Sequence, residues 1–162
     1  MIQDSSNKQN KLELVYIENL VPQDHLLRLI DKHIRFDFIY DLVKDLYCED
    51  NGRPALDPVV LFKMLFIGYL YGIRSERQLE KEIQVNIAYR WFLGLSLTDE
   101  VPDHSTISQN RRRRFKGTDI FQKVFDEIVL QGIEHKLISG KVLYTDSTHL
   151  KANANKRKYI IE

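Results

Sequence analysis

The amino-acid sequence predicts a mainly α-helical protein in which a multi-helix N-terminal domain is followed by one β-strand near the end of the chain. Apolar residues recur every three or four positions through much of the first 138 residues, which is the helical period. Residues that favour helix ends precede several of these segments. After Gly140 a short β-branched and aromatic stretch, 141–147, is typical of a strand. We therefore expect a flexible lead over 1–22, a helical domain over 23–138 and the start of a second, α/β domain over 139–162.

Two helices are expected in the first third of the chain. Pro22 precedes a helix over 24–33, and a second helix over 36–48 carries apolar residues at three- and four-residue spacing. The sequence Asn-Gly-Arg-Pro at 51–54 predicts the turn that follows. Cys48 is the single cysteine, so no internal disulfide can form, and we interpret it as a packing residue in a reducing compartment.

Asp57 and Pro58 mark the start of a third helix. The aspartate can accept hydrogen bonds from the first backbone N–H groups, and proline is tolerated at the first helical position. The residues at 59–67 are apolar on nearly every side of this helix, apart from Lys63. Such a helix is usually the centre of a small bundle. The alternative, that part of it forms a dimer interface, stays open.

Two short helices are expected next. Ser75 followed by Gln78 is a capping-box pattern at the start of the first one. Asn86 can cap the second helix, and Gly94 can close it in the left-handed conformation. A loop that contains Pro102 follows.

Thr118 is expected to cap the last long helix. The apolar stripe of that helix consists of Phe121, Val124, Phe125, Ile128 and Val129. A single strand over 141–147 would leave its backbone groups unpaired, so we expect the second domain to be incomplete in this chain.

Charge is distributed unevenly along the chain. The net charge is −4 over 1–50, zero over 51–100 and +5 over 101–162, so a polyanion would prefer the last third. The apolar segment 59–73 falls short of the ~20 residues that span a bilayer. The polar segment 1–11 has no signal-peptide pattern, and we expect a cytoplasmic protein without a membrane partner.

The segment 103–115 predicts an unusually polar helix, whose apolar residues are Ile107 and Phe115. One or two of its arginines would face DNA, and the others would pair with acids such as Glu80 or Glu82. After two short capped helices, this order is typical of a helix-turn-helix with the polar helix as reader. A solvated, salt-bridged surface helix is an equal alternative. The candidate DNA-binding residues here are Ser105, Thr106, Ser108, Gln109, Arg111, Arg112 and Arg113.

Asp146 lies inside the predicted strand. A carboxylate is costly there unless it is paired or binds a cation, and such aspartates commonly hold Mg²⁺ in phosphoryl-transfer enzymes. The simpler interpretation from the neighbouring residues is an aspartate that caps a turn at the end of the strand.

The segment 151–158 is strongly basic. It suits a phosphate backbone, and a solvated tail is an equal alternative. His104 and His149 have no partners at metal-ligand spacing, so we interpret both as hydrogen-bonding residues. The candidate DNA contacts of the basic segment are Lys151, Lys156 and Arg157.

Three stretches resemble bacterial insertion-sequence transposases in which a helical N-terminal domain precedes a DDE catalytic domain. They are GIRSERQLEKEIQVNIAYRWFLGL at 72–95, VPDHSTISQNRRRRF at 101–115 and VLYTDSTHLKANANK at 142–156. The resemblance covers nearly the whole chain from about Leu12. It implies an RNase H-like fold for the second domain, with Asp146 as the first catalytic aspartate. It also implies that the N-terminal domain binds the terminal inverted repeats of the element as double-stranded DNA.

The resemblance further implies Mg²⁺, held by two aspartates and one glutamate for in-line attack on DNA phosphodiesters. The chain ends soon after Asp146, and Glu162 is the only later acid. We therefore expect a truncated chain that cannot cleave DNA alone, because one carboxylate does not hold two metals. The leading hypothesis is the DNA-binding front part of a transposase, located in the bacterial cytoplasm at the nucleoid. The alternative is a helical module that forms a homodimer and has little affinity for DNA.

Overall fold

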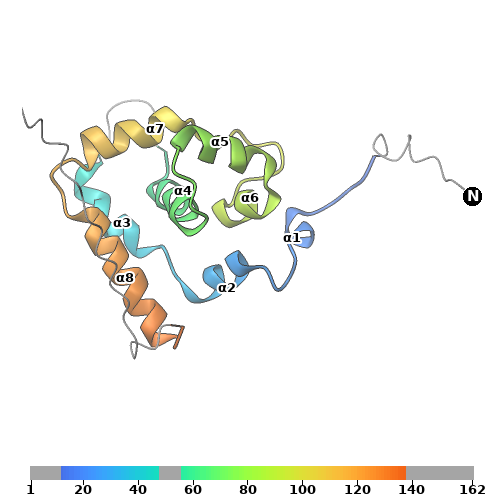
Figure 1. Cartoon of the computed structure of the whole chain (residues 1–162), viewed down its shortest axis with the longest axis horizontal. Helices are drawn as coiled ribbons and strands as arrows, with labels where there is room; N and C mark the ends of the chain where they lie inside the picture. Colours follow the sequence, from blue (N-terminus) through green and yellow to red (C-terminus); the bar gives the residue numbers. More distant parts are fainter. Residues whose placement is uncertain (1–11, 48–55, 138–162) are drawn as a thin grey trace, which may run out of the picture.

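The computed structural model describes residues 12–47 and 56–137, and every regular element in these ranges is a helix (Figure 1). The predicted mainly α-helical class is confirmed for this part of the chain. The predicted strand over 141–147, the turn over 51–54 and Cys48 lie outside the described residues. The described elements are α1 (Ile17–Leu20), α2 (Leu26–His33), α3 (Phe38–Val43), a 3₁₀ turn (Lys44–Leu46), α4 (Pro58–Leu70), α5 (Glu76–Val85), α6 (Ile87–Leu93), α7 (His104–Gln109), a π-turn (Asn110–Arg114) and α8 (Ile120–Glu134).

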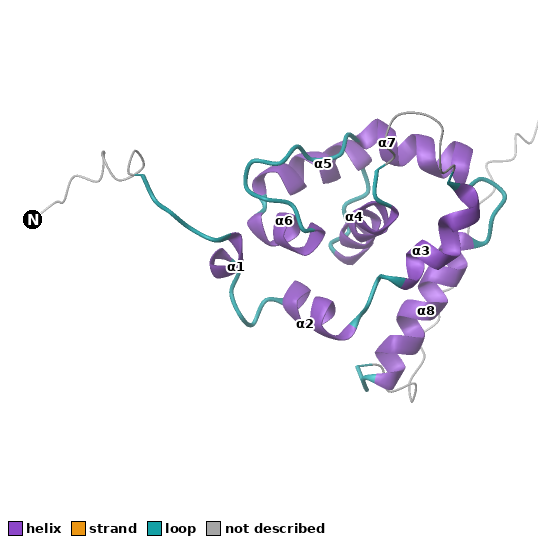
Figure 2. Ribbon diagram, turned by 180° about the vertical axis from the view of Figure 1, so that it is seen from behind, coloured by secondary structure: helices purple, strands orange, loops and turns teal. Residues whose placement is uncertain are grey.

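Helix α4 lies at the centre of the domain, with the other helices arranged around it (Figure 2). It contacts α3, α5 and α6, and its Leu61, Met64 and Ile67 are fully buried. The interpretation of this helix as the core is therefore confirmed. Neither α4 nor any other helix in the described ranges is long and apolar enough to cross a membrane.

Lys63 is the one charged residue on α4, and its contacts explain why a lysine stands in an apolar helix. Its ammonium group donates hydrogen bonds to a carboxylate oxygen of Asp31 on α2 (2.9 Å) and to the carbonyl of Phe92 on α6 (3.0 Å). It also lies 4.5 Å from the centroid of the Phe92 ring, a cation–π contact. Lys63 therefore links three helices while its alkyl stem packs in the core.

The predicted cap of α4 is confirmed, and we expect it to contribute measurably to stability. Asp57 accepts hydrogen bonds from the backbone N–H groups of Val59 (2.7 Å) and Val60 (3.4 Å), and from the hydroxyl of Tyr40 (2.8 Å). We expect Asp57→Ala to lower the free energy of unfolding by about 1–2 kcal/mol in chemical denaturation, because these donors lose their acceptor. Asp57→Asn retains a side-chain acceptor and should stay close to the wild type. Equal losses in the two variants would contradict the capping role.

The predicted ends of α5 and α6 are confirmed as well. Ser75 accepts from the backbone N–H of Gln78 (3.4 Å), and Asn86 accepts from that of Tyr89 (3.1 Å). Gly94 closes α6 with φ at +74°, a conformation that favours glycine. Asn86 ends α5 and caps α6, so a single residue joins the two helices.

Arg90 on α6 is 5% exposed and holds the loop that leads to α7. Its guanidinium donates from Nε (2.9 Å) and Nη2 (2.7 Å) to the carbonyl of Ser96, and from Nη2 to that of Asp99 (2.5 Å). Asp99 in turn accepts from the backbone N–H of Ser96 (2.7 Å). A buried arginine is thus satisfied by loop carbonyls, and the loop adopts a defined path toward α7.

The start of α8 differs from the prediction. Thr118 does not cap this helix, because its hydroxyl donates to the carbonyl of Phe115 (2.9 Å), and the residue at the N-cap is Asp119. The predicted apolar stripe also packs only in part. Val124 is buried, whereas Phe125 is 61% exposed because α8 borders the domain and contacts chiefly α3.

The segment before α2 packs against α6. Glu18 accepts hydrogen bonds from Arg28 and from the indole N–H of Trp91, and the Arg28 guanidinium lies 4.6 Å from the Trp91 ring centroid. Val21 is buried, so the described core begins inside the segment that we expected to be a lead.

Candidate nucleic-acid interface

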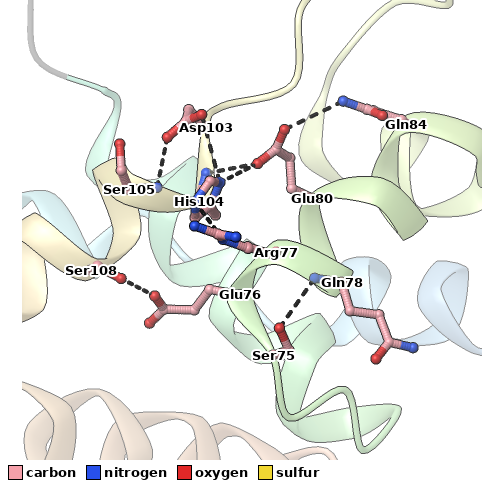
Figure 3. A network of polar contacts seen from close by, with 10 residues as sticks. All are labelled: Ser75, Glu76, Arg77, Gln78, Glu80, Gln84, Asp103, His104, Ser105 and Ser108. Carbon is pink, nitrogen blue, oxygen red and sulfur yellow. Dashed lines mark hydrogen bonds and ion pairs between the residues drawn. The ribbon is translucent and has the colours of Figure 1, made fainter.

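Helix α7 is attached to α5 at its N-terminus by a histidine (Figure 3). A carboxylate oxygen of Glu80 accepts from the backbone N–H (2.9 Å) and from Nδ1 (2.8 Å) of His104. The Nε of Arg77 donates to Nε2 of the same ring (3.1 Å). With Arg77 at Nε2 and Glu80 at Nδ1, the contacts fit the tautomer that carries its proton on Nδ1.

A second acid on α5 binds farther along the polar segment 103–115. Glu76 accepts from the hydroxyl of Ser108 through one oxygen and from Nη1 of Arg111 (3.0 Å) through the other. We expected Glu80 or Glu82 to pair with the arginines, and this was wrong. Helix α7 runs antiparallel to α5, so its later residues meet the earlier acid of α5.

The three groups Glu80, Asp103 and His104 form a tight cluster. One ligand atom of each lies within 4.8 Å of the others, a spacing that would suit a metal ion. Each group already has a hydrogen-bond partner, however: Asp103 caps α7 by accepting from Ser105 N–H (2.7 Å), and Arg77 donates to the imidazole. We therefore interpret the cluster as the joint between α5 and α7.

The charge of Glu80 should make this joint sensitive to acid. Hydrogen bonds from the backbone N–H and the ring of His104 hold the pKa of Glu80 below its ordinary value of 4.5. Its contribution to stability is therefore complete above the ordinary pKa and is lost as pH falls through the lowered pKa. We expect Glu80→Gln to be less stable than the wild type near neutral pH, with a difference that shrinks as the pH falls below the ordinary carboxyl pKa. Chemical denaturation along a series of acidic pH values measures this, with Glu82→Gln as the control for losing a carboxylate from α5. A difference that does not change with pH would contradict the assignment.

The opposite side of α7 lines a polar groove of about 1060 Å³. Ser105, Thr106, Gln109 and Arg113 contribute to this groove. Three of these residues, Ser105, Gln109 and Arg113, are exposed and lie at four-residue intervals, so they share one side of the polar segment 103–115. The groove is also lined by Leu46, Leu56, Glu100, Pro102 and Asp103.

The segment beyond α7 continues as a π-turn, which the sequence analysis did not predict. The N–H of Phe115 donates to the carbonyl of Asn110 (3.0 Å), five residues earlier. Asn110 donates to the Thr106 carbonyl (2.8 Å) and accepts from Nη1 of Arg114 (2.6 Å). The guanidinium of Arg114 also lies 3.9 Å from the centroid of the Tyr47 ring. Phe115 itself is buried, as is Ile107, so both apolar residues of this segment face the core.

The predicted DNA-binding residues thus divide between two sides of the polar segment 103–115. Ser108 and Arg111 contact α5. Arg111 and Arg112 are both exposed, but Arg112 makes no hydrogen bond or ion pair within the described residues. The roles of Glu76 and Arg114 were not predicted from the sequence. The recurrence of acids four residues apart on α5 was the available signal for Glu76. The other predicted site residues lie outside the described residues: Asp146, His149, Lys151, Lys156 and Arg157.

The connection between α6 and α7 bears on the helix-turn-helix interpretation. Residues 94–103 join these helices, and this loop is longer than the three- or four-residue turn of that motif. Helix α7 packs mainly on α5. The helix-turn-helix assignment therefore stays a prediction.

A family model described as "Transposase domain (DUF772)" matches residues 15–113. The matched range begins just before α1 and ends within the π-turn, so it includes the joint between α5 and α7 and most of the groove. Comparisons with curated proteins and with solved structures give no match.

Proposed function

The chain belongs to the transposase-domain family DUF772 and has a role related to transposition; from this premise we propose that its helical domain binds the terminal inverted repeats of an insertion sequence as double-stranded DNA. The domain would act as the N-terminal, DNA-recognising part of the transposase, in the bacterial cytoplasm at the nucleoid. The groove side of α7 would contact base edges, and the basic residues beside it would contact phosphates.

The observation that carries this proposal is the polar row on the outer side of α7. Ser105, Gln109 and Arg113 face outward along one side, while Glu76 and Glu80 hold the other side to α5. Glutamine can form a paired hydrogen bond with adenine, arginine can do so with guanine, and serine can contact either. A helix that keeps such side chains outward is suited to reading a major groove.

An electrophoretic mobility shift with two duplexes tests this function. One duplex carries the end sequence of the element that encodes the chain, and the other has a mixed sequence. We expect tighter binding to the end sequence, and we expect Ser105→Ala with Gln109→Ala to reduce the preference about tenfold or more. Gln122→Ala on α8 is the matched control. Equal binding of the wild type to both duplexes would contradict the proposal.

A homodimer is a second candidate, and one observation favours it. Helix α8 exposes apolar side chains at Phe125, Leu130 and Ile133, each about half exposed or more. Exposed apolar surface of this kind often marks an interface with another protein. Sedimentation that shows a monomer at all concentrations would remove this candidate.

We also propose that the family type is DDE, with Asp146 as its first metal-binding acid and Mg²⁺ as the metal. The support is the motif at 142–156 together with membership in a transposase-domain family. Lys151, Lys156 and Arg157 would add phosphate contacts beside that acid. Asp146→Asn should abolish Mg²⁺-dependent DNA cleavage by the transposase that contains this sequence. Cleavage that survives this change would contradict the assignment.

A further inference from the structure

We infer that the four consecutive arginines of the π-turn have two separate tasks: Arg111 and Arg114 fix the turn to the domain, while Arg112 and Arg113 bind the DNA backbone. The inference rests on the proposed DNA binding and deepens it. The sequence alone treats the four residues as equivalent, since they follow one another without interruption. Their contacts in the folded domain are different.

Arg111 is committed to α5. Its Nη1 donates to Glu76 at 3.0 Å, and the side chain of Glu76 is only 23% exposed. The second oxygen of Glu76 is occupied by Ser108. If Arg111 turned to a phosphate, the carboxylate would lose its only cationic partner among the described residues, so phosphate must compete with an existing ion pair.

Arg114 is committed at the other end of the turn. It donates to Asn110 at 2.6 Å, and its guanidinium lies 3.9 Å from the centroid of the Tyr47 ring. Asn110 also donates to the Thr106 carbonyl and thereby ties Arg114 to the last turn of α7. Arg114 is partly buried. Stacking on an aromatic ring and a planar hydrogen bond are contacts that arginine makes and that a solvated cation does not need.

Arg112 and Arg113 make no such contacts within the described residues. Both are exposed, and within the described residues neither makes a hydrogen bond or an ion pair. Arg113 lines the groove together with Ser105 and Gln109, so a duplex whose bases meet those residues would bring its backbone close to Arg113. Arg112, which directly precedes Arg113, is also exposed to solvent. Binding a phosphate would break no hydrogen bond or ion pair that these two side chains make within residues 12–47 and 56–137.

The test uses the whole 162-residue chain and a short mixed-sequence duplex, in four variants that each replace one arginine with glutamine. Each lost phosphate contact should reduce the slope of log affinity against log salt by ~0.9. We expect this reduction in Arg112→Gln and Arg113→Gln, with an unchanged melting temperature. We expect Arg111→Gln and Arg114→Gln to keep the slope but to lower the melting temperature by about 2–4 °C, because they lose structural contacts.

Three further variants give readouts that a merely structural role would not change. Arg112→Lys and Arg113→Lys keep a point charge and should restore most of the slope. Glu76→Gln removes the competing carboxylate and should increase the slope by up to ~0.9, as Arg111 becomes available for phosphate. Glu82→Gln makes the same charge change elsewhere on α5 and should have little effect.

The outcomes separate this inference from the proposed function. If the wild type binds DNA without salt dependence, or does not bind, the proposed function fails and the inference fails with it. If the wild type binds with a steep salt dependence, but the slope falls equally in all four glutamine variants or falls in Arg111→Gln and Arg114→Gln, only the inference is overturned.

Discussion

Replacing Arg90 with alanine is expected to lower the free energy of unfolding by about 3 kcal/mol, because hydrogen bonds from a buried charged group are among the stronger ones in proteins. The guanidinium donates hydrogen bonds to the carbonyls of Ser96 and Asp99, and the side chain is almost fully shielded from solvent. Truncation leaves both carbonyls without their donor and leaves a cavity beneath the loop.

Arg90→Ala should also weaken the proposed DNA binding, because the loop that Arg90 holds leads to Asp103 and α7. Denaturant unfolding measures the loss of stability, and a mobility shift under conditions where the variant is folded measures the second effect. Arg112→Ala, which removes an exposed arginine, should change stability by less than about 0.5 kcal/mol. Arg90→Lys should recover only part of the loss, because one ammonium group cannot reproduce the planar fork. Wild-type stability in Arg90→Ala would show that the loop keeps its path without this side chain.

Leu61→Ala is expected to lower the free energy of unfolding by between about 2 and 5 kcal/mol. Leu61 is fully buried on the central helix α4, so its truncation removes apolar contacts and opens a cavity among helices that cannot close around it. A loss of this size is a large part of the stability of a small domain.

Phe125→Ala is the matched comparison for Leu61→Ala. Phe125 is also apolar and helical, yet it is 61% exposed on α8, so its truncation should cost less than about 0.5 kcal/mol. Thermal or urea unfolding of the two variants side by side measures both values. A loss at Phe125 as large as that at Leu61 would mean that the outer side of α8 is covered in solution, which would favour the homodimer.

The features that could be predicted from the sequence depend on neighbours in the chain. Asp57, Ser75 and Asn86 were identified as helix caps because a cap needs only an acceptor and backbone N–H groups two or three residues later. Gly94 was identified as a helix end for the same local reason. The apolar surroundings of 59–67 likewise indicated the central helix.

The features that could not be predicted depend on residues far apart in the chain. The choice of Glu76 over Glu82 as the partner of Arg111 follows from the antiparallel packing of α7 on α5, which no local pattern reveals. Thr118 had the residue type of a cap, but a bond to the Phe115 carbonyl directs its hydroxyl away from α8. The contacts of Lys63 join three helices, and they likewise could not be predicted from the sequence.

The residues of α7 divide into those that pack against the domain and those that face solvent. Ile107 faces the core and His104 and Ser108 bind α5, whereas Ser105 and Gln109 touch solvent and the groove. Substitutions at the outward positions therefore remove little that the fold depends on. Under the proposed DNA recognition, substitutions at 105 and 109 would change the bound sequence without a second, compensating mutation in the core. The protein would then follow changes in its DNA site one substitution at a time.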